Sequence, residues 1–253
     1  MSTDSPVVVV ENFTKYYGQF AAVTELSFKV HAGEIVGLVG ANGAGKTTAL
    51  RGITGILRPS AGRILVSGHD IERSPVQAKR AFAYIPDTLH PYDALTVTEH
   101  LNFIALTYGV RDAEKKYAAL LREVELADKA HEMAANLSRG MLQKLSLACA
   151  FLREPRVVIL DEPLTGLDPR GIRNIKESIR CRAASGMAFL LSSHLLELVE
   201  ALCDRVMILH GGKSMAFGSL EDIREKATLR HEASLEEAFF AITERPTEAA
   251  EVS

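Results

Sequence analysis

The chain has 253 residues, of which 47% are hydrophobic and 24% are charged, so it is long enough for one large core or two smaller ones. Its formal net charge of -3 at pH 7 supplies no overall basic field for a nucleic-acid backbone, so a nucleic-acid partner is not expected. The three cysteines are odd in number, far apart in the sequence and without a C-x-x-C pair. They are therefore predicted to be reduced core thiols of a cytosolic protein.

Neither an export signal nor a membrane-spanning helix is indicated. The first residues contain no basic segment followed by a long apolar run, so export through this end is not expected. No window approaches the roughly 20 apolar residues that a bilayer-spanning helix needs. Even the run "MAFLLSSHLLELV" is interrupted by serines, a histidine and a glutamate. The sequence therefore predicts a cytoplasmic protein whose role at a membrane would be peripheral.

Short β-rich runs alternate with longer helical patterns, which predicts an α/β core. The runs that predict strands are, in chain order, "VVVVENF", "ELSFKV", "IVGLVG", "RILVSG", "AFAYIP", "RVVILD", "MAFLLSS" and "DRVMILH". Between Thr96 and Asn136 this pattern stops and apolar residues recur at helical spacing, which predicts a helical subdomain inserted over about residues 96–150. After "HGGKSMAFG", whose paired glycines suggest a hairpin turn, two helical stretches and a frayed tail are expected over about residues 219–253.

The stretch "GLVGANGAGKTTALRG" matches the G-x-x-x-x-G-K-[ST] spacing of a phosphate-binding loop, between an apolar run and a helical pattern. Phosphate oxygens are met by convergent backbone N–H groups, and Gly40, Gly43 and Gly45 would leave that approach open. Lys46 would supply a positive charge for the β- and γ-phosphates, and Thr47 a hydroxyl for Mg²⁺. ATP and Mg²⁺ are therefore the expected cofactors.

The alternative to this interpretation is a glycine-rich turn that happens to precede a lysine. The flanking strand and helix patterns make that alternative improbable. A second phosphate-like stretch, "GGKS" at residues 211–214, has Met207 where the first glycine of the motif would have to stand. It is therefore predicted to be a hairpin turn.

Two adjacent carboxylates follow the apolar run "RVVIL". Asp161 ends this predicted strand, where an acid can hold the Mg²⁺ shell if the strand shares a sheet with the phosphate loop. Glu162 follows it and could orient or deprotonate the water that attacks the γ-phosphate. The alternative, a strand that merely ends in an acidic turn, becomes improbable with a phosphate loop upstream.

Six motifs that occur in this order resemble the nucleotide-binding subunits of ABC transporters. They span most of the chain and read "KYYGQF", "GANGAGKTT", "LSRGM", "VVILDEP", "TGLDP" and "LLSSHLLEL". The resemblance implies one nucleotide-binding domain over residues 1–253, with a P-loop NTPase core of ABC type, an antiparallel β subdomain and an inserted α-helical subdomain.

The resemblance also implies roles for individual residues. Tyr17 would stack on adenine, Asp168 would lie in a loop that passes between two subunits, and His194 would contact the γ-phosphate. Without the family pattern, Tyr17 would more often be a core or surface aromatic, and His194 a helix-cap histidine. The remaining residues implied to bind the nucleotide are Asn42, Ala44 and Thr48.

The stretch "LSRGM" corresponds to the family motif usually written LSGGQ, which places a helix N-terminus against the ATP bound by the opposite subunit. Ser138 is a good N-cap, and its hydroxyl, the N–H of Gly140 and the positive helix end could address a γ-phosphate. Arg139 replaces a glycine, but it keeps a backbone N–H, and its side chain could extend to solvent or add a favourable charge. Met141 loses an amide, for which Gln143 is the nearest replacement. The alternative is a capped amphipathic helix without this role.

A second departure from the family pattern occurs at Asp87, where the loop after "AFAYIP" usually carries a glutamine that reaches Mg²⁺ and the attacking water. Together with "LSRGM", this acid resembles the exporter-associated branch, in particular the Ecs-type and ABC-2 exporter ATPases. Asp87 is therefore expected to act in catalysis and at the metal. The alternative is a passive loop acid.

The expected function is an ATP-hydrolysing subunit that powers a membrane transporter, with an exporter favoured, through ATP-driven dimerisation. Its partners would be a multispanning permease subunit and a second copy of itself or a related ATPase subunit. The expected location is the cytoplasmic face of the cell membrane, through the permease. Two alternatives are a soluble ABC-type ATPase acting in translation or DNA repair, and a regulatory member that does not hydrolyse ATP.

Overall fold

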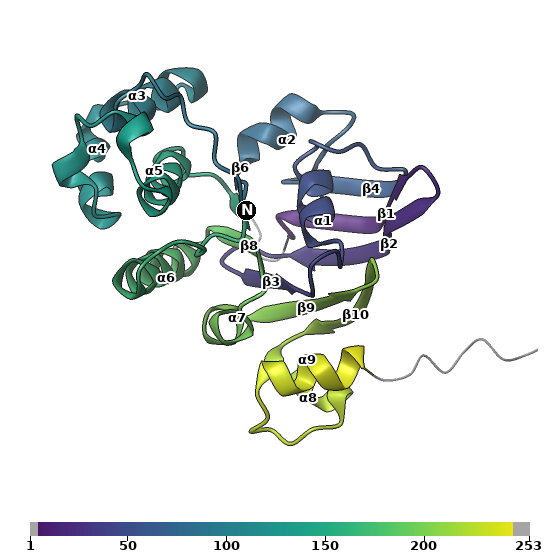
Figure 1. Ribbon diagram of the computed structural model, residues 1–253. Coiled ribbons are helices and arrows are strands. Elements are labelled where there is room, and N and C mark those ends of the chain that lie inside the picture. The colour runs from purple at the N-terminus through teal and green to yellow at the C-terminus, as the bar shows by residue number, and fades with distance from the viewer. Residues whose placement is uncertain (1–4, 245–253) are drawn as a thin grey trace, which may run out of the picture.

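The computed structural model describes residues 5–244 and contains two sheets and a group of helices beside them (Figure 1). The larger sheet has the strand order β10-β9-β3-β8-β7-β6, in which β9, β3, β8, β7 and β6 are parallel and β10 is antiparallel. Its strands are β3 (Ile35–Val39), β6 (Phe82–Ile85), β7 (Val157–Asp161), β8 (Ala188–Ser193), β9 (Arg205–His210) and β10 (Lys213–Gly218). The α/β core expected from the alternating pattern is confirmed.

The second sheet is antiparallel and has the order β2-β1-β4-β5. Its strands are β1 (Val8–Tyr17), β2 (Phe20–Val30), β4 (Ala61–Val66) and β5 (His69–Asp70). Four helices accompany the sheets: α1 (Lys46–Ile53), α2 (Pro75–Ala81), α6 (Pro169–Ala184) and α7 (Leu196–Leu202). Two sheets in one chain therefore match the implied P-loop core and antiparallel β subdomain.

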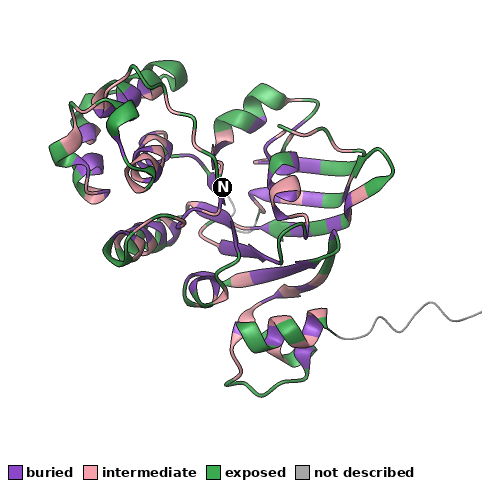
Figure 2. Cartoon of the chain, in the orientation of Figure 1, coloured by how far each residue is buried: buried purple, intermediate pink, exposed green. Residues whose placement is uncertain are grey.

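The central strands of the larger sheet are mostly apolar because both of their faces are covered. All five residues of β3 and of β7 are buried, and Figure 2 shows β3 in the colour of buried residues. Ile35 and Val39 pack on one side of the sheet with the helices, whereas Val36 and Leu38 pack on the other side with the antiparallel sheet. One sheet thus separates two hydrophobic cores.

From residue 97 to residue 152 the regular elements are helical, and we call this segment the helical lobe. It contains α3 (Val97–Tyr108), α4 (Glu114–Glu123), α5 (Arg139–Leu152) and the short 3₁₀ helices η1 (Ala127–Lys129) and η2 (Ala134–Asn136). Thr96 and Glu99 form a reciprocal capping box that starts α3, which satisfies two backbone donors at the point where the strand pattern ends. Figure 1 shows the lobe beside the β6 end of the larger sheet.

The chain continues from the larger sheet into a C-terminal pair of helices, α8 (Leu220–Ala227) and α9 (Leu235–Thr243). Gly211 and Gly212 have φ of 54° and 77° in the β9–β10 turn, so the "GGKS" stretch is a hairpin turn, as predicted. The expected tail falls on residues 245–253 and lies outside the described residues. Within residues 5–244 no helix is both long and apolar enough to cross a membrane.

The expectation that the cysteines are core thiols is wrong for one of them. Cys203 is buried and Cys149 is partly buried, but Cys181 is exposed on α6. The helical spacing of apolar residues in α6 places Ile175 and Ile179 in the core, and Cys181 lies two residues after Ile179, off the buried face.

Candidate functional site

The phosphate loop lies between β3 and α1, at the carboxyl end of the parallel strands. In such a sheet this edge is where ligands bind. Lys46 is 8% exposed, and its Nζ donates hydrogen bonds to the carbonyl oxygens of Gly40 at 2.7 Å and Ala41 at 3.3 Å. Burial lowers the pKa of the Lys46 amine from its ordinary value, while the carboxylates of Glu162 and Asp161 act to raise it. Lys46 is thus held inside the loop, where its amine could contact the phosphates.

Two of the three motif glycines are required by contacts within the protein. A Cβ at Gly40 would lie 2.5 Å from the Leu209 carbonyl oxygen, and one at Gly45 would lie 2.7 Å from the Ala22 carbonyl oxygen. Gly43 borders open space but has φ of 81°, a conformation that glycine adopts at little cost. Of the three glycines, only Gly43 has no neighbouring atom within reach of an added Cβ. Gly40 and Gly45 allow the loop to pack against neighbouring backbone.

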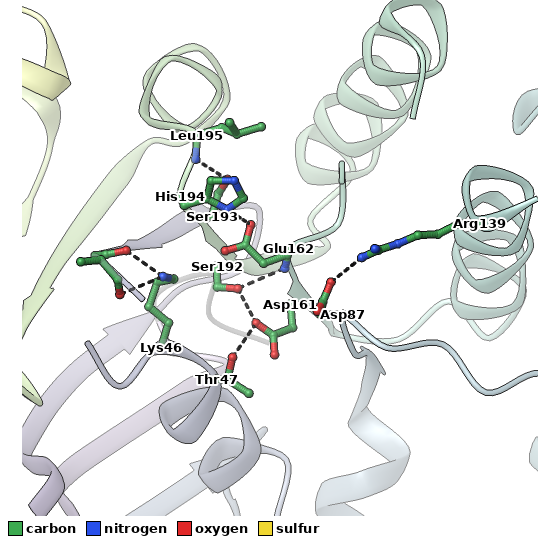
Figure 3. Close-up of polar contacts among 12 residues, drawn as sticks. Lys46, Thr47, Asp87, Arg139, Asp161, Glu162, Ser192, Ser193, His194 and Leu195 are labelled. Carbon is green, nitrogen blue, oxygen red and sulfur yellow. Dashed lines mark hydrogen bonds and ion pairs between the residues drawn. The ribbon is translucent and has the colours of Figure 1, made fainter. Parts of the chain in front are cut away.

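A hydroxyl and a buried carboxylate meet next to this loop (Figure 3). Thr47 Oγ1 donates a hydrogen bond to Asp161 Oδ1 at 3.2 Å, and Ser192 Oγ donates to the same oxygen at 2.6 Å. Asp161 is 2% exposed and Ser192 is fully buried. Parallel pairing of β7 with β8, with Asp161 opposite Ser192, produces this contact. Ser192 was not among the predicted site residues. The feature of the sequence that could have indicated it is a serine near the end of an otherwise apolar strand.

The oxygens of Thr47 and Asp161 suit Mg²⁺, because this hard cation prefers carboxylate, hydroxyl and water ligands and is commonly held by one or two protein groups plus phosphate. In the described part of the chain no group of three or more His, Cys, Asp or Glu side chains could hold a metal ion. When bound, Mg²⁺ would supply positive charge that offsets the negative charge of the phosphates.

Glu162 leaves the line of β7 immediately after Asp161. Its φ of 50° is a left-handed conformation that costs a non-glycine residue about 1 kcal/mol. Its backbone N–H donates to Ser192 Oγ at 3.1 Å, and its Oε2 lies 2.9 Å from His194 Nδ1. His194 does not cap α7, whose N-cap is Leu195. The structure therefore brings Glu162 and His194 together, in a position from which a carboxylate can orient a water molecule.

We expect Ser192→Ala to destabilise the protein and to slow ATP hydrolysis. The substitution removes a donor to the buried Asp161 carboxylate and an acceptor for the Glu162 N–H. A hydrogen bond to a charged group contributes about 1.5–3 kcal/mol, so the free energy of unfolding should fall by about that amount. Denaturant unfolding measures this effect.

Ser193→Ala is the matched control, because Ser193 Oγ accepts only the N–H of Leu195 among the contacts observed. Its loss should cost about 1 kcal/mol and leave turnover nearly unchanged. Equal losses of stability and turnover in the two variants would contradict the role given to Ser192.

The start of α5 carries the residues Ser138 and Gly140. Ser138 is the N-cap, and its Oγ accepts the N–H of Met141 at 3.3 Å, so the predicted N-cap is present. A Cβ at Gly140 would lie 2.8 Å from the Gly166 carbonyl oxygen, which means that α5 begins against the loop that follows Glu162. Gln143 is 4% exposed, so the expectation that it could replace the missing amide at the surface is wrong.

Two further predicted residues lie at the edges of the site. Asp168 is the N-cap of α6, and its Oδ1 accepts the N–H of Gly171 at 3.0 Å. Tyr17 ends β1 and is 48% exposed, so it is not a core aromatic. Lys15 Nζ lies 5.5 Å from the centre of its ring. The strand β2 that pairs with β1 approaches the phosphate loop, because a Cβ at Gly45 would meet the Ala22 carbonyl oxygen.

Asp87, two residues beyond β6, does not touch the other site residues in the contacts observed. Its Oδ1 accepts a hydrogen bond from Arg139 Nη2 at 2.8 Å, and Figure 3 shows this pair to one side of Asp161 and Glu162. The Arg139 side chain therefore does not extend freely into solvent. This contact joins residues that are 52 positions apart and was not predicted.

The sheet, the buried lysine in its loop and the aspartate at the end of the adjacent strand define a P-loop nucleotide-binding protein. The family model described as ABC transporter matches residues 23–165. The ABC-type transporter ATP-binding protein EcsA of Bacillus subtilis is 36% identical over 92% of this chain and 95% of its own length. The SkfA peptide export ATP-binding protein SkfE of the same species is 38% identical over 88% of this chain and 93% of its own length.

A solved structure of the ATP-binding subunit of an ABC transporter is 39% identical, with a TM-score of 0.89, and the match covers 93% of this chain and 99% of that one. The chain therefore belongs to the ABC transporter family, as a nucleotide-binding subunit with ATPase activity that powers transport. The α/β fold of ABC type and the family assignment predicted from the six motifs are confirmed.

Proposed function

We propose that this subunit hydrolyses MgATP at the carboxyl edge of the larger sheet. Lys46 and the loop N–H groups would bind the phosphates, Thr47 and Asp161 would hold the Mg²⁺ shell, and Glu162 would activate water. The observation that carries this proposal is the joining of Thr47, Asp161 and, through Ser192, Glu162 into one hydrogen-bonded group. Asn42, Ala44, Thr48 and the ring of Tyr17 complete the proposed nucleotide site. The Lys46→Ala variant argued in the Discussion tests it.

We further propose that ATP is bound between two such subunits, either two copies of this chain or this chain and a related one. Arg139, the first residue of α5, lies on the far side of Asp87 from Lys46 (Figure 3), so the backbone donors of Ser138 and Gly140 beside it need a nucleotide from another subunit. Asp168, which follows the loop against which α5 begins, would lie at the same interface. His194 would approach the γ-phosphate while it holds Glu162.

The transporter partner that we propose is a multispanning permease, which would keep this subunit at the cytoplasmic face of the membrane. A groove of about 350 Å³ lies between the β6 end of the sheet and the helical lobe. It is lined by aromatic side chains, including Tyr92, Phe103 and Tyr108, and by the residues that follow Asp87. A short cytoplasmic segment of the permease would dock there, next to Asp87.

Export is the transport direction we propose, because SkfE is named for peptide export and shares most of this chain. The matched relatives are transporter ATP-binding proteins, so we propose transport rather than translation or DNA repair. We also infer one nucleotide-binding domain, with the helical lobe as its inserted subdomain and α8 and α9 as a C-terminal addition.

Asp87→Ala should leave ATP affinity within a few-fold, because Lys46 and the loop backbone hold most of the phosphate charge. Hydrolysis stimulated by the permease should fall much more than basal hydrolysis, since Asp87 directly follows Pro86, which lines the groove. The measurement is paired: nucleotide affinity of the isolated subunit, and turnover with and without the permease in lipid.

Asp93→Ala is the control, because Asp93 is an exposed acid of the same loop that forms no ion pair with any residue between 5 and 244. It should leave both turnover values unchanged. Equal loss of basal and stimulated turnover in Asp87→Ala would make Asp87 a metal-site residue only, and no loss in either would make it a passive loop acid.

A further inference from the structure

One exposed ion pair connects the helical lobe to the sheet at the nucleotide end of the molecule. Arg139 is the first residue of α5, and Asp87 follows β6. Their Nη2 and Oδ1 atoms are 2.8 Å apart, and the side chains are 58% and 47% exposed. The stem of Arg139 also lies along Gly166, where an added Cβ would meet its Cδ at 3.4 Å. The pair therefore lies between the loop after Glu162 and the loop after β6.

Asp87 occupies the same sheet edge as the proposed catalytic carboxylates. β6 pairs in parallel with β7, with Ile85 opposite Leu160, so the residues after Ile85 and after Leu160 leave the sheet side by side. The register brings Pro86 level with Asp161 and places Asp87 one residue further along the same edge, while the Asp87 carboxylate is turned to Arg139 (Figure 3). Because the Asp87 carboxylate is paired with Arg139, it is not free to contact groups in the nucleotide site.

The other end of α5 is attached more firmly to the sheet. Arg153 follows the last residue of α5, and its Nη2 donates to the carbonyl oxygens of Phe82 at 2.9 Å and Lys79 at 3.2 Å. Its guanidinium also stacks on the Tyr108 ring at 3.5 Å. Two residues further on, Pro155 leads toward β7. The C-terminal end of α5 is therefore fixed, and a helix of 14 residues spans about 20 Å from that end to Arg139.

The helical lobe is also tied to α6 by a less exposed contact. Arg182 Nη2 donates to Glu123 Oε2 at 2.9 Å, and the two side chains are 21% and 32% exposed. Arg182 also stacks on the Phe151 ring at 3.8 Å. Exposed ion pairs contribute about 0–1 kcal/mol, so the contact between Asp87 and Arg139 is one that a small movement of the lobe can open at little cost.

We propose that Arg139 is a positioning residue that holds Asp87 away from the nucleotide site in the separate subunit, and that the pair opens when two subunits close over ATP. Asp87 then enters the hydrolysis site only in the closed, permease-bound state. This inference rests on the proposed function, because it requires closure of two subunits. It also gives the reason why Asp87→Ala should affect stimulated hydrolysis more than basal hydrolysis.

The position of the lobe is the first readout, and it needs neither nucleotide nor activity. Spin labels would be placed on cysteines introduced at Leu106 of α3 and at Ile56 after α1, both exposed, with the three native cysteines replaced by alanine. In nucleotide-free protein, Arg139→Ala should broaden the distance distribution, and Arg139→Lys should retain the wild-type distribution. The double exchange Asp87→Arg with Arg139→Asp should also retain it, because the pair is restored with its charges reversed.

The matched control is Lys115→Ala, which removes an exposed ion pair with Asp112 at 2.7 Å that lies wholly within the helical lobe. It should leave the distance distribution unchanged. A wild-type distribution in Arg139→Ala would overturn the proposal, whether or not the subunit hydrolyses ATP. Failure of the wild-type subunit to hydrolyse ATP would instead contradict the proposed function.

Turnover is the second readout. It distinguishes an Arg139 that positions Asp87 from an Arg139 that only stabilises the fold. Arg139→Ala should raise basal turnover roughly two- to fivefold, the factor that corresponds to loss of an exposed ion pair, with KM unchanged. In the Asp87→Ala background the same substitution should have no effect. The double exchange should restore the lobe position but hydrolyse like Asp87→Ala, since position 87 then lacks a carboxylate. An equal rise in both backgrounds, or no rise in either, would overturn the proposal.

Discussion

Replacing Lys46 by alanine should abolish ATP hydrolysis and weaken nucleotide binding. The Lys46 Nζ is buried against the Gly40 and Ala41 carbonyl oxygens, so its charge is fixed inside the loop before ATP arrives. Removal of one preorganised donor to a reacting group typically lowers turnover by about 10²–10³-fold. Loss of a hydrogen bond to a charged group costs about 1.5–3 kcal/mol, so ATP affinity should fall by at least about tenfold.

The chain supplies a matched control for this substitution. Lys213 follows the two glycines of the β9–β10 turn in the stretch "GGKS", which resembles a phosphate loop in sequence but is a hairpin. Lys213→Ala should therefore leave both ATP affinity and turnover unchanged. Phosphate release and binding of a fluorescent ATP analogue measure the two quantities, and thermal unfolding verifies that both variants are folded. Wild-type turnover in Lys46→Ala would contradict the assignment of the nucleotide site.

The parts of this fold that depend on local sequence could be predicted. The parallel strands are continuous apolar runs because helices and the antiparallel sheet cover both faces. The phosphate loop is one contiguous motif, and the cap at Ser138 involves Met141, three positions away. In each of these cases the determining residues are neighbours in the chain, so propensity and spacing are sufficient.

The parts that depend on residues far apart in the chain could not be predicted. Ser192 and Asp161 are 31 positions apart and meet only because β7 and β8 pair in one particular register. The contact between Arg139 and Asp87 requires the helical lobe to fold back on β6. Gln143 lies on the face of α5 that is buried within the helical lobe. The first residues of α5 are partly exposed, so the position of Gln143 in the sequence did not show that its amide would be buried.

These non-local contacts also change the interpretation of the altered family motifs. Arginine in "LSRGM" and aspartate in place of the usual glutamine could be taken as two independent departures. The structure joins them into one ion pair, so the positive charge gained at position 139 is balanced by the negative charge gained at position 87. Without its partner, Arg139 would place a positive charge at the positive end of the α5 dipole, which is unfavourable.

Glu162→Gln should trap the closed dimer and nearly stop hydrolysis. Glutamine has the shape of glutamate and can still contact His194 Nδ1, which lies 2.9 Å from Glu162 Oε2. The left-handed backbone of residue 162 and its N–H bond to Ser192 do not depend on the carboxylate. Asp161 and Thr47 keep their oxygens, so MgATP binding should persist. What is lost is the proposed general base, which typically contributes about 10²–10⁴-fold to the rate.

The measurement is the molecular mass of the subunit by light scattering with and without MgATP, together with phosphate release. Glu154→Gln is the matched control, because Glu154 also has a positive φ, of 48°, but pairs with Lys116 at 2.8 Å on the helical lobe. It should behave as wild type in both measurements. Glu162→Gln should be monomeric without nucleotide and dimeric with MgATP, because closure then occurs without the hydrolysis that reopens it. If Glu162→Gln remains monomeric at saturating MgATP and hydrolyses ATP at the wild-type rate, both the catalytic role of Glu162 and the binding of ATP between two subunits are wrong.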